Sequence, residues 1–326
     1  MNKIRRIGVL TSGGDSSGMN AAIRAVVRTA VYNHIEVVGI KRGYAGLIDN
    51  EFVELKTIDV ANIIHRGGTI LKSARCEEFM TKEGRQIAFN NLKAQSIDAL
   101  IVIGGNGTYA GANIFFQEFL FPIIGLPGTI DNDINGTDVT IGSDTALNNA
   151  IWAIDKIRDT ADAHDRVFFV EVMGRDSGFI GLNTGIAVGA EAILIPEILD
   201  DTALLFSYFT RNKKRKKMFS IIIVTEGNIE GNAFEIANKV REKFDYLDIR
   251  VSVLGHMQRG GNPTANDRLV ASELGYHAVK FLIEEKHGFA LGKNGKGITL
   301  TSFIEAIKKN NNVDNSLWKM SKVLSL

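Results

Sequence analysis

Several features that define other classes of protein are scarce or missing in this chain. It has a single cysteine, Cys76, which excludes an intramolecular disulfide framework and indicates a reducing compartment. No stretch reaches 18 consecutive apolar residues, and the first residues lead into a core strand rather than a secretion signal. The sequence therefore predicts a cytoplasmic protein without a membrane segment.

The sequence also lacks a large net charge and a clear set of metal ligands. The formal net charge is +1, so neither nucleic acid nor a membrane surface would be attracted by the molecule as a whole. Six scattered histidines and one cysteine offer no zinc cluster. The one dense basic run, residues 213–217, is either a solvated turn or a local anion site.

What the chain does contain is a repeated alternation of short apolar runs with amphipathic helical patterns. At 326 residues and 45% apolar content it can bury one or two full cores. Strands that alternate with helices predict an α/β fold with parallel sheets. No low-complexity linker divides the chain, and four prolines are too few to mark a boundary.

The most informative segment is the acidic turn PGTIDND at residues 127–133. It follows an apolar run from Pro122 to Leu126, which predicts a buried strand that delivers polar residues to the carboxyl edge of a sheet. If the turn is extended, Asp131 and Asp133 project to the same side and favour a cation, an attacking hydroxyl or a shared proton between them. The alternative is an Asx-rich turn without chemistry.

Two glycine turns between a predicted strand and the segment that follows it are candidate phosphate sites. The turn TSGGDSSG joins a strand at Ile7–Leu10 to a helix at Met19–Tyr32, and GGNGT follows a strand at Ala99–Ile103. Such turns aim free backbone amides and a positive helix end at an anion. Neither has the GxxxxGK[ST] or GxGxxG form, and close packing alone explains many single glycine turns. Two of them beside an acidic turn predict a metal-bridged polyphosphate.

Two further strand-to-glycine blocks carry cations. RVFFVEVMGRDSG contains Arg166 and Arg175, and RVSVLGHMQRGG contains Arg250, His256 and Arg259. Arginine near the end of a strand suits bidentate recognition of phosphate oxygens. Each arginine alone is compatible with a surface position or a salt bridge, but four at comparable positions predict a basic pocket.

Taken in order, these motifs make the chain resemble the bacterial ATP-dependent 6-phosphofructokinases. The resemblance runs from about Ile4 to the final helix. It implies transfer of the γ-phosphoryl group of ATP to the 1-hydroxyl of fructose 6-phosphate, the committed step of glycolysis. The motifs that carry it are GGD at 13–15, SAR at 73–75, GTIDND at 128–133, VMGR at 172–175 and GHMQRGG at 255–261.

The resemblance also implies an architecture of two similar lobes, each a mostly parallel sheet flanked by helices. We expect an ATP-binding lobe at residues 1–138, to which a segment at about 256–305 crosses back. A sugar-phosphate-binding lobe at residues 139–255 would be completed by a final helix at about 306–326. In the family, Arg166 and Arg250 reach across from a neighbouring subunit, which implies a homotetramer.

Residue roles follow from the same resemblance. Asp131 would accept the proton of the attacking sugar hydroxyl, and Thr129 and Asp133 would position the sugar and the phosphoryl group. Arg175 and the backbone of Gly14 would stabilise charge on the transferring oxygens. The other implied contacts to the sugar phosphate are Ile130, Arg166, Met173, Gly174, Glu226, Arg250, His256, Met257, Gln258 and Arg259.

Glycine at two positions predicts ATP rather than pyrophosphate as the phosphoryl donor. Relatives that use pyrophosphate place Asp and Lys at the positions of Gly107 and Gly128, which fills the space of the α-phosphate. The residues that the resemblance assigns to ATP are Gly14, Tyr44, Arg75, Cys76, Gly105, Asn106, Gly107 and Thr108.

One departure from the family concerns magnesium. Asn106 stands where the family has an aspartate that helps to hold Mg²⁺, so an oxygen ligand is kept but a charge is lost. We expect a cost of about 1–3 kcal/mol, or about 10–100-fold in activity. Asp144 is a candidate compensating carboxylate; alternatively, Ser143 or Asp144 caps the helix that runs into Ala153.

The family also has a regulatory site between subunits that binds ADP or phosphoenolpyruvate. Thr57 and Phe219 replace a basic residue and a histidine of that site, so we expect effector binding with a changed response. The residues that match the site are Arg24, Arg28, Arg158, Gly189, Glu191, Arg215 and Lys217.

Three functions remain open at this point. The first is the ATP-dependent kinase, and the second is the same reaction with pyrophosphate, which Gly107 and Gly128 argue against. The third is a regulatory paralogue without turnover, for which Asn106 is the only support and against which the intact Asp131 argues. NAD kinases and lipid kinases share a similar glycine loop after a strand, but they lack the two arginine blocks.

Overall fold

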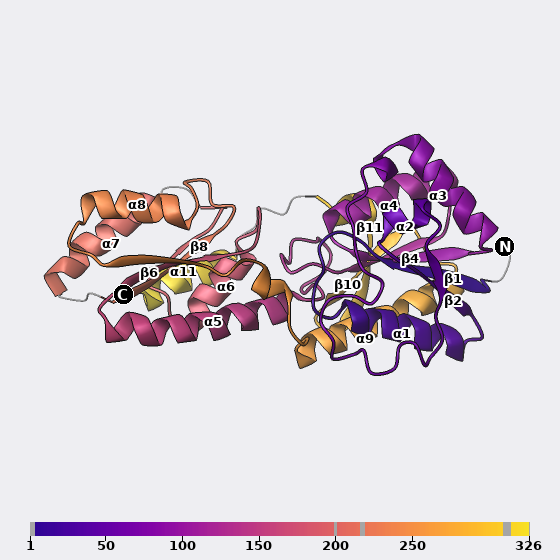
Figure 1. The fold of residues 1–326 in the computed structure, drawn as a ribbon, viewed down its shortest axis with the longest axis horizontal. Helices are drawn as coiled ribbons and strands as arrows, with labels where there is room; N and C mark the ends of the chain where they lie inside the picture. The colour runs from indigo at the N-terminus through magenta and orange to yellow at the C-terminus, as the bar shows by residue number, and fades with distance from the viewer. Residues whose placement is uncertain (1–3, 199–200, 216–218, 309–313, 326) are drawn as a thin grey trace. The chain divides into compact units, whose positions relative to one another are not determined.

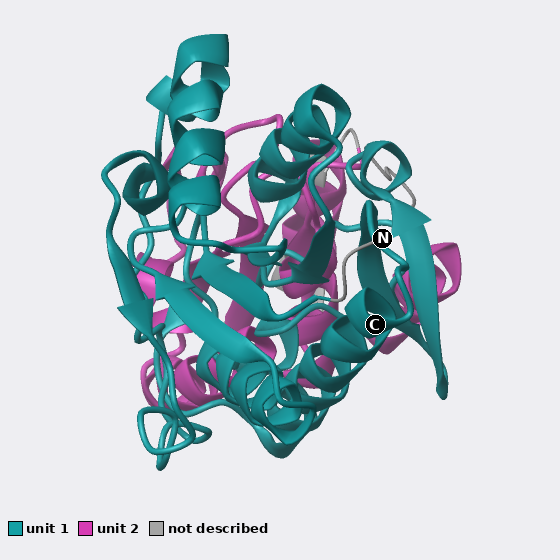
Figure 2. Ribbon diagram, turned by 90° about the vertical axis from the view of Figure 1, so that its right-hand side faces the viewer, with its two compact units in different colours: residues 1–145, 259–310 teal, residues 146–258, 311–326 magenta. Residues whose placement is uncertain are grey.

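The computed structural model describes residues 4–198, 201–215, 219–308 and 314–325 (Figure 1). The chain divides into two compact units, residues 1–145 with 259–310 and residues 146–258 with 311–326 (Figure 2). Each unit has its own mostly parallel sheet with flanking helices, so the predicted fold class is confirmed. Within the described ranges, no helix combines the length and apolar character that a membrane crossing requires.

The first unit is built on a seven-stranded sheet in the order β11-β10-β5-β4-β1-β2-β3. Its parallel strands are β1 (Arg6–Thr11), β2 (Glu36–Ile40), β4 (Ala99–Gly104), β5 (Ile123–Pro127) and β10 (Phe289–Asn294). The edge strands β3 (Phe52–Glu54) and β11 (Gly297–Ser302) pair antiparallel. Because β1, β4 and β5 are neighbours, the three segments that follow them meet at one edge of the sheet.

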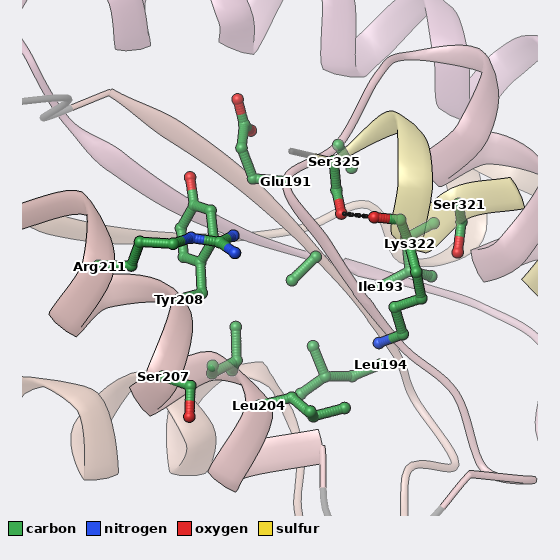
Figure 3. A pocket seen from close by; sticks show the side chains of 13 residues that line it. Glu191, Ile193, Leu194, Leu204, Ser207, Tyr208, Arg211, Ser321, Lys322 and Ser325 are labelled. Carbon is green, nitrogen blue, oxygen red and sulfur yellow. Dashed lines mark hydrogen bonds between the residues drawn. The ribbon is translucent and has the colours of Figure 1, made fainter. Parts of the chain in front are cut away.

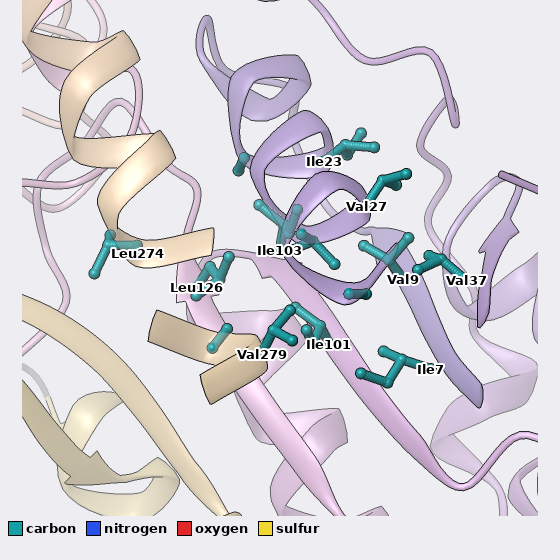
Figure 4. Close-up of a cluster of buried hydrophobic side chains, with 14 of the residues drawn as sticks. Ile7, Val9, Ile23, Val27, Val37, Ile101, Ile103, Leu126, Leu274 and Val279 are labelled. Carbon is teal, nitrogen blue, oxygen red and sulfur yellow. The ribbon is translucent and has the colours of Figure 1, made fainter. Parts of the chain in front are cut away.

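Both faces of this sheet are buried, which explains its continuous apolar runs. Ile101 and Ile103 of β4 point into the core under α1 (Met19–Tyr32) and α9 (Ala265–Ile283), as Figure 4 shows. Their neighbours Leu100 and Val102 point into the opposite core, because successive side chains of a strand alternate between faces. The helices around that second core are α2 (Tyr44–Ile48), α3 (Lys82–Ala94), α4 (Asn106–Phe119) and α10 (Phe303–Ala306).

The second unit contains a four-stranded, wholly parallel sheet in the order β7-β8-β6-β9. One face packs Phe169 and Ile222 against Phe209, Val240 and Phe244 of the covering segments. The strands are β6 (Val167–Val172), β7 (Ala192–Leu194), β8 (Ser220–Thr225) and β9 (Ile249–Val253). The helices are α5 (Ser143–Ala163), α6 (Phe179–Ala187), α7 (Asp201–Arg215), α8 (Ala233–Lys243) and α11 (Asn315–Leu324).

The start of α5 is capped by a residue that is distant in sequence. The carboxylate of Asp267, 1% exposed, accepts the backbone N–H of Gly142 at 2.8 Å. It also accepts the N–H of Thr145 at 2.8 Å and its hydroxyl at 2.5 Å. Asp267, in the first turn of α9, thus caps the start of α5, and a cap by Ser143 or Asp144 stays a prediction.

Candidate active site

The loops after β1, β4 and β5 are tied together at the carboxyl edge of the first unit's sheet. The backbone N–H of Ser12 donates to the carbonyl of Ile103 at 3.0 Å, and the Thr108 hydroxyl donates to the carbonyl of Ser12 at 3.1 Å. The N–H of Gly128 donates to the carbonyl of Gly104 at 3.0 Å. The structure therefore brings both glycine turns and the acidic turn to one place.

The first turn of α4 is an open helix N-terminus. The helix begins at Asn106, three residues before the Tyr109 segment that the sequence placed after the turn, because the extended Gly105 turns the chain directly out of β4. The N-cap residue Gly105 has no side chain with which to cap this end, and the first amides of a helix have no partner within it. Gly107 is exposed, and a Cβ built on it would meet no atom within 4 Å. This end of α4 is free to receive an anion.

The loop after β1 is backed by a buried cation. Gly13 has a positive φ of 83°, and both it and Gly14 are exposed. The Arg259 guanidinium donates from Nη1 to the carbonyl of Asp15 at 3.0 Å, and the same nitrogen lies 2.9 Å from where a Cβ on Gly14 would stand. The Ser73 hydroxyl donates to the carbonyl of Gly13. Arg259, predicted among the sugar-phosphate contacts, lies against the candidate phosphate loop.

The acidic turn is bent at its central residue. Asn132 has a left-handed φ of 48°, so the segment is not extended and the two aspartates do not project together as in a strand. The Asn132 side chain accepts the N–H of Thr140 at 2.8 Å and donates to the carbonyl of Asp138 at 3.0 Å. These two bonds tie the bend at Asn132 to residues 138 and 140 and so hold the backbone beside Asp131, which is 3% exposed.

A short hydrogen bond joins the acidic turn to α4. Nδ2 of Asn106 donates to Oδ2 of Asp133 at 2.6 Å. Oδ1 of Asn106 is buried, with no hydrogen-bond partner among the described residues. Asn106 is thus linked to the acidic turn through its amide nitrogen, while its carbonyl oxygen remains available to a ligand.

The oxygen ligands here fit a magnesium ion that is shared with a substrate. In the described part of the chain, no three His, Cys, Asp or Glu residues are grouped as a metal cage. Mg²⁺ in phosphoryl-transfer sites commonly takes only one or two protein carboxylates and completes its shell with phosphate oxygens and water. The carboxylate of Asp133 and the buried Oδ1 of Asn106, on side chains joined by a hydrogen bond, suit that arrangement.

Three of the residues that the resemblance assigns to ATP differ in exposure. Tyr44 is 6% exposed, stacks on Phe79 with ring centroids 3.9 Å apart, and donates from its hydroxyl to the carbonyl of Thr108 at 2.7 Å. Burial raises the pKa of Tyr44 well above its usual value, so it remains a neutral donor. Arg75 is exposed and Cys76 is partly buried. In this structure Tyr44 supports the first turn of α4 from within the core.

In the second unit, Arg175 and Glu226 lie at the carboxyl ends of β6 and β8. Arg175 is exposed with a left-handed φ of 52°, and its N–H donates to Oε1 of Glu226 at 3.1 Å. A Cβ on Gly227 would lie 1.6 Å from the carbonyl oxygen of Arg175, so only glycine fits beside this bend. Gly174, with a φ of 152°, precedes it. The VMGR motif therefore presents its arginine from a tightly constrained turn.

The GHMQ segment of the same unit is organised around Gln258. This side chain is 1% exposed, accepts the N–H of Met173 at 3.4 Å, and donates to the carbonyl of Gly255 at 3.1 Å. His256 and Met257 are exposed beside it. Gln258 thus supports the turn between β9 and the following segment, and His256 is the member of this group that is open to a ligand.

Arg166 and Arg250 lie at the opposite, amino-terminal end of the second unit's sheet. They share Asp248, with Nε of Arg166 at 2.9 Å and Nη2 of Arg250 at 3.1 Å from its oxygens. Arg166 precedes the six-residue strand β6, whereas Met173 follows it. The two arginines therefore do not join the VMGR turn within the chain, and their contribution to a neighbouring subunit remains a prediction.

Part of the predicted effector set gathers between α5, α6 and the adjoining strands. The Arg158 guanidinium donates to the carbonyl of Val188 and lies 5.5 Å from the ring centroid of Phe219. Gly189 has a φ of 62°, and Glu191, 8% exposed, accepts a backbone N–H of β8 at 2.7 Å. The aromatic ring that replaces the family's histidine thus stacks on one of the predicted effector cations.

The other predicted effector residues are less well defined. Arg24 and Arg28 lie on α1 in the first unit, where burial and the charge of Arg28 lower the pKa of Arg24. Arg215 is the last residue of α7, and its side chain is not among those described. Lys217 lies outside the described residues.

A cavity of about 360 Å³ in the second unit was not predicted from the sequence. Figure 3 shows Leu194 and Leu204 at its apolar side and Arg211 and Lys322 on opposite walls. Glu191 also lines it. Its walls come from β7, α7 and α11, which are separated by long stretches of chain, so no single segment of sequence carries a signal for it.

Comparison with known proteins decides the family. The sequence profile described as Phosphofructokinase matches residues 6–282, far more than half of the chain. The chain belongs to the phosphofructokinase family. This membership accounts for the motif order GGD, SAR, GTIDND, VMGR and GHMQRGG, and it confirms the resemblance drawn from those motifs.

Bacterial relatives of this phosphofructokinase are similar over their full length. The chain is 51% identical over 326 residues to ATP-dependent 6-phosphofructokinase 2 of Bacteroides thetaiotaomicron, covering 100% of both chains. It is 51% identical over 323 residues to the ATP-dependent 6-phosphofructokinase of Bacillus subtilis, covering 99% of this chain and 100% of that one. The solved phosphofructokinase of Saccharomyces cerevisiae has a TM-score of 0.88 at 35% identity. This chain, 98% of which is covered, spans about half (48%) of that yeast chain.

Proposed function

We propose that this phosphofructokinase transfers the γ-phosphoryl group of ATP to the 1-hydroxyl of fructose 6-phosphate, giving fructose 1,6-bisphosphate and ADP in glycolysis. The observation that carries the proposal is the 51% identity, over the whole chain, to relatives named ATP-dependent 6-phosphofructokinase. The sheet edge of the first unit has the anion-binding helix end and the acidic turn that this reaction requires.

The space at the start of α4 supports ATP as the donor. A side chain at Gly107 would extend into open space, where it would occupy the volume beside the first amides of the helix. At Gly128 a Cβ would stand 2.9 Å from Met19 and 3.0 Å from Ile103, so packing also favours glycine there. Two glycines leave the nucleotide's α-phosphate room that an Asp and a Lys would fill.

Asp131 is proposed as the base. Its carboxylate is buried on a turn that Asn132 and Thr140 hold, so it would meet the sugar hydroxyl with little reorganisation. Its own N–H donates to the Thr129 hydroxyl at 3.3 Å, which fixes the backbone on its amino side. A base positioned in this way contributes about 10²–10⁴-fold to the rate.

The negative charge of the transferring group would be met by several groups of the first unit. The first amides of α4, the backbone of Gly13 and Gly14 and the guanidinium of Arg259 all lie on the loops at this edge. A magnesium ion held by Asn106 Oδ1, Asp133 and the nucleotide's phosphates would neutralise part of that charge. Charge stabilisation of this kind supplies most of the catalysis in phosphoryl transfer.

The remaining parts of the proposal concern assembly and regulation. Arg175 would help to stabilise the charge on the transferring oxygens, and Glu226 and His256 would hold the sugar phosphate. Arg166 and Arg250 would be supplied by a neighbouring subunit of a cytoplasmic homotetramer. ADP or phosphoenolpyruvate would bind at the effector residues around Arg158, Gly189 and Glu191. Their support is the family membership together with the local arrangement of these side chains.

The test is formation of fructose 1,6-bisphosphate by the purified protein from fructose 6-phosphate, with ATP or pyrophosphate, across titrations of Mg²⁺ and Mn²⁺. We expect turnover with ATP alone and a raised metal requirement that Asn106→Asp lowers. Turnover with pyrophosphate would contradict the choice of donor. No turnover with either donor, and no rescue by Asn106→Asp, would leave a ligand-binding regulatory subunit instead.

A further inference from the structure

Asn106 and Asp133 form a pair that differs electrostatically from a pair of carboxylates. The 2.6 Å hydrogen bond between Nδ2 and Oδ2 places an amide against a charge, so the contact is attractive in the absence of any metal. Asn106 opens α4, and Asp133 ends the acidic turn, so this bond fastens one phosphate-binding element to the other. Both residues belong to the first unit, so the contact lies within one compact body.

A carboxylate at position 106 would reverse the sign of this contact. Two negative oxygens at hydrogen-bond distance repel each other unless a cation or a proton lies between them. The helix end acts in the opposite direction, because a negative charge at the first position of a helix is stabilised by the macrodipole. The pair repulsion and the helix dipole therefore predict opposite effects of Asn106→Asp on stability.

We propose that Asn106 is a positioning residue that holds Asp133 and the acidic turn in place without a divalent cation. The inference rests on the proposed function only in assuming that magnesium enters this site with the nucleotide. The amide nitrogen fastens the turn, and the buried Oδ1 stays available to the incoming ion. The acidic turn is then formed before substrate binds, but the site binds the metal more weakly than it would with an aspartate at position 106.

The experiment compares thermal unfolding of the full chain in EDTA and in magnesium chloride, without nucleotide. We expect the wild-type midpoint to be nearly the same in both. Asn106→Asp should unfold about 3–8 °C lower in EDTA, because a charge-assisted hydrogen bond is lost and a repulsion is added. Millimolar Mg²⁺ should recover most of that loss.

Two further variants separate the pair from the helix end. The double variant Asn106→Asp/Asp133→Asn keeps one amide and one carboxylate in contact, so we expect it to regain most of the midpoint in EDTA and to lose the magnesium response. Asn315→Asp introduces the same charge at the first, exposed position of α11. The neighbouring carboxylate there, Asp314, is exposed and already accepts the N–H groups of Ser316 and Leu317, so we expect little loss and no magnesium response.

Each outcome counts for or against the proposal. A midpoint of Asn106→Asp equal to or above wild type in EDTA would overturn it, as would a double variant no more stable than the single one. If Asn106→Asp yields no folded protein without metal, the double variant tests the proposal instead. A folded double variant in EDTA would require the attractive contact between residues 106 and 133. The unfolding midpoints do not depend on catalysis, so they remain interpretable if the kinase assay fails. Conversely, midpoints that contradict the role of Asn106 would leave the kinase proposal intact.

Discussion

At the scale of the residue, Asp131 offers a direct test of the chemistry. It is 3% exposed, and its turn is held by side-chain bonds of Asn132, so Asn fits the position without changing the backbone. We expect Asp131→Asn to lower kcat for fructose 6-phosphate phosphorylation by about 10²–10⁴-fold with a small change in KM, because only proton transfer is lost. Steady-state kinetics with ATP at saturating Mg²⁺ provide the measurement.

Asp138→Asn is the matched control, since it removes the same charge from the same loop. Asp138 is exposed, and its carboxylate accepts the N–H of Gly295 at 2.7 Å, away from the acidic pair. It should keep kcat close to the wild-type value. An Asp131→Asn enzyme with more than about a tenth of wild-type kcat would remove Asp131 from the role of base.

Single residues also show where sequence reasoning ends. The motif GTIDND indicated that Asp131 lies at a sheet edge, because an apolar run followed by polar residues is a local signal. The 2.6 Å bond between Asn106 and Asp133 could not be predicted, because it depends on the left-handed bend at Asn132 and on where α4 begins. Similarly, the sequence indicated that Arg259 binds a phosphate group. Its contact with the loop after β1 could not be predicted, because it joins residues 244 positions apart.

At the scale of the element, the junction of α5 with α9 is held by reciprocal capping. Asp267 caps α5 through Gly142 and Thr145, while the hydroxyl of Thr264, the N-cap of α9, donates to Asp144 at 2.5 Å. Asparagine at position 267 would keep one acceptor oxygen. Its N–H₂ group would face N–H and O–H donors, with which it cannot form a hydrogen bond. We expect Asp267→Asn to lower the free energy of unfolding by about 1–3 kcal/mol in chemical denaturation.

The pH dependence of that loss has a definite sign. Burial, the largest influence, raises the pKa of Asp267, so the folded protein binds its proton more tightly than the unfolded chain does. The stability that this group contributes is fully present below its unfolded pKa and is lost as pH rises through the folded pKa. The gap between wild type and Asp267→Asn should therefore narrow with rising pH across that interval. A gap that widens would contradict the raised pKa.

The elements themselves were predictable to the extent that their signals are local. The apolar runs gave β1, β4 and β5, and the helical pattern gave α1 with the bounds Met19–Tyr32. The predicted start of α4 lay too late in the sequence. A glycine-rich segment has the composition of a loop even where its residues already belong to a helix. The capping role of Asp267 at α5 could not be predicted, because Asp267 lies 122 residues from Thr145. Packing between distant segments, such as the close approach of Gly275 to Ala22, has no local signature.

At the scale of the whole molecule, the question is how many chains make one site. Met173 and Arg175 are at the carboxyl end of the second unit's sheet, while Arg166 and Arg250 share Asp248 at its amino end. A six-residue strand spans about 20 Å, so one sugar phosphate cannot contact both ends at once. If both sets bind the same substrate, they must come from different subunits.

Mixing two variants with different defects tests that conclusion. Asp131→Asn should lack turnover, and Arg166→Ala/Arg250→Ala should have a KM for fructose 6-phosphate raised at least 10-fold, because two charge-assisted contacts are lost. Oligomers reassembled from an equal mixture would contain sites with an intact Asp131 from one chain and intact arginines from its neighbour. We expect low-KM activity to appear in the mixture although neither parent has it. Absence of recovery, in mixtures shown by mass analysis to contain mixed oligomers, would mean that the arginines do not act across subunits.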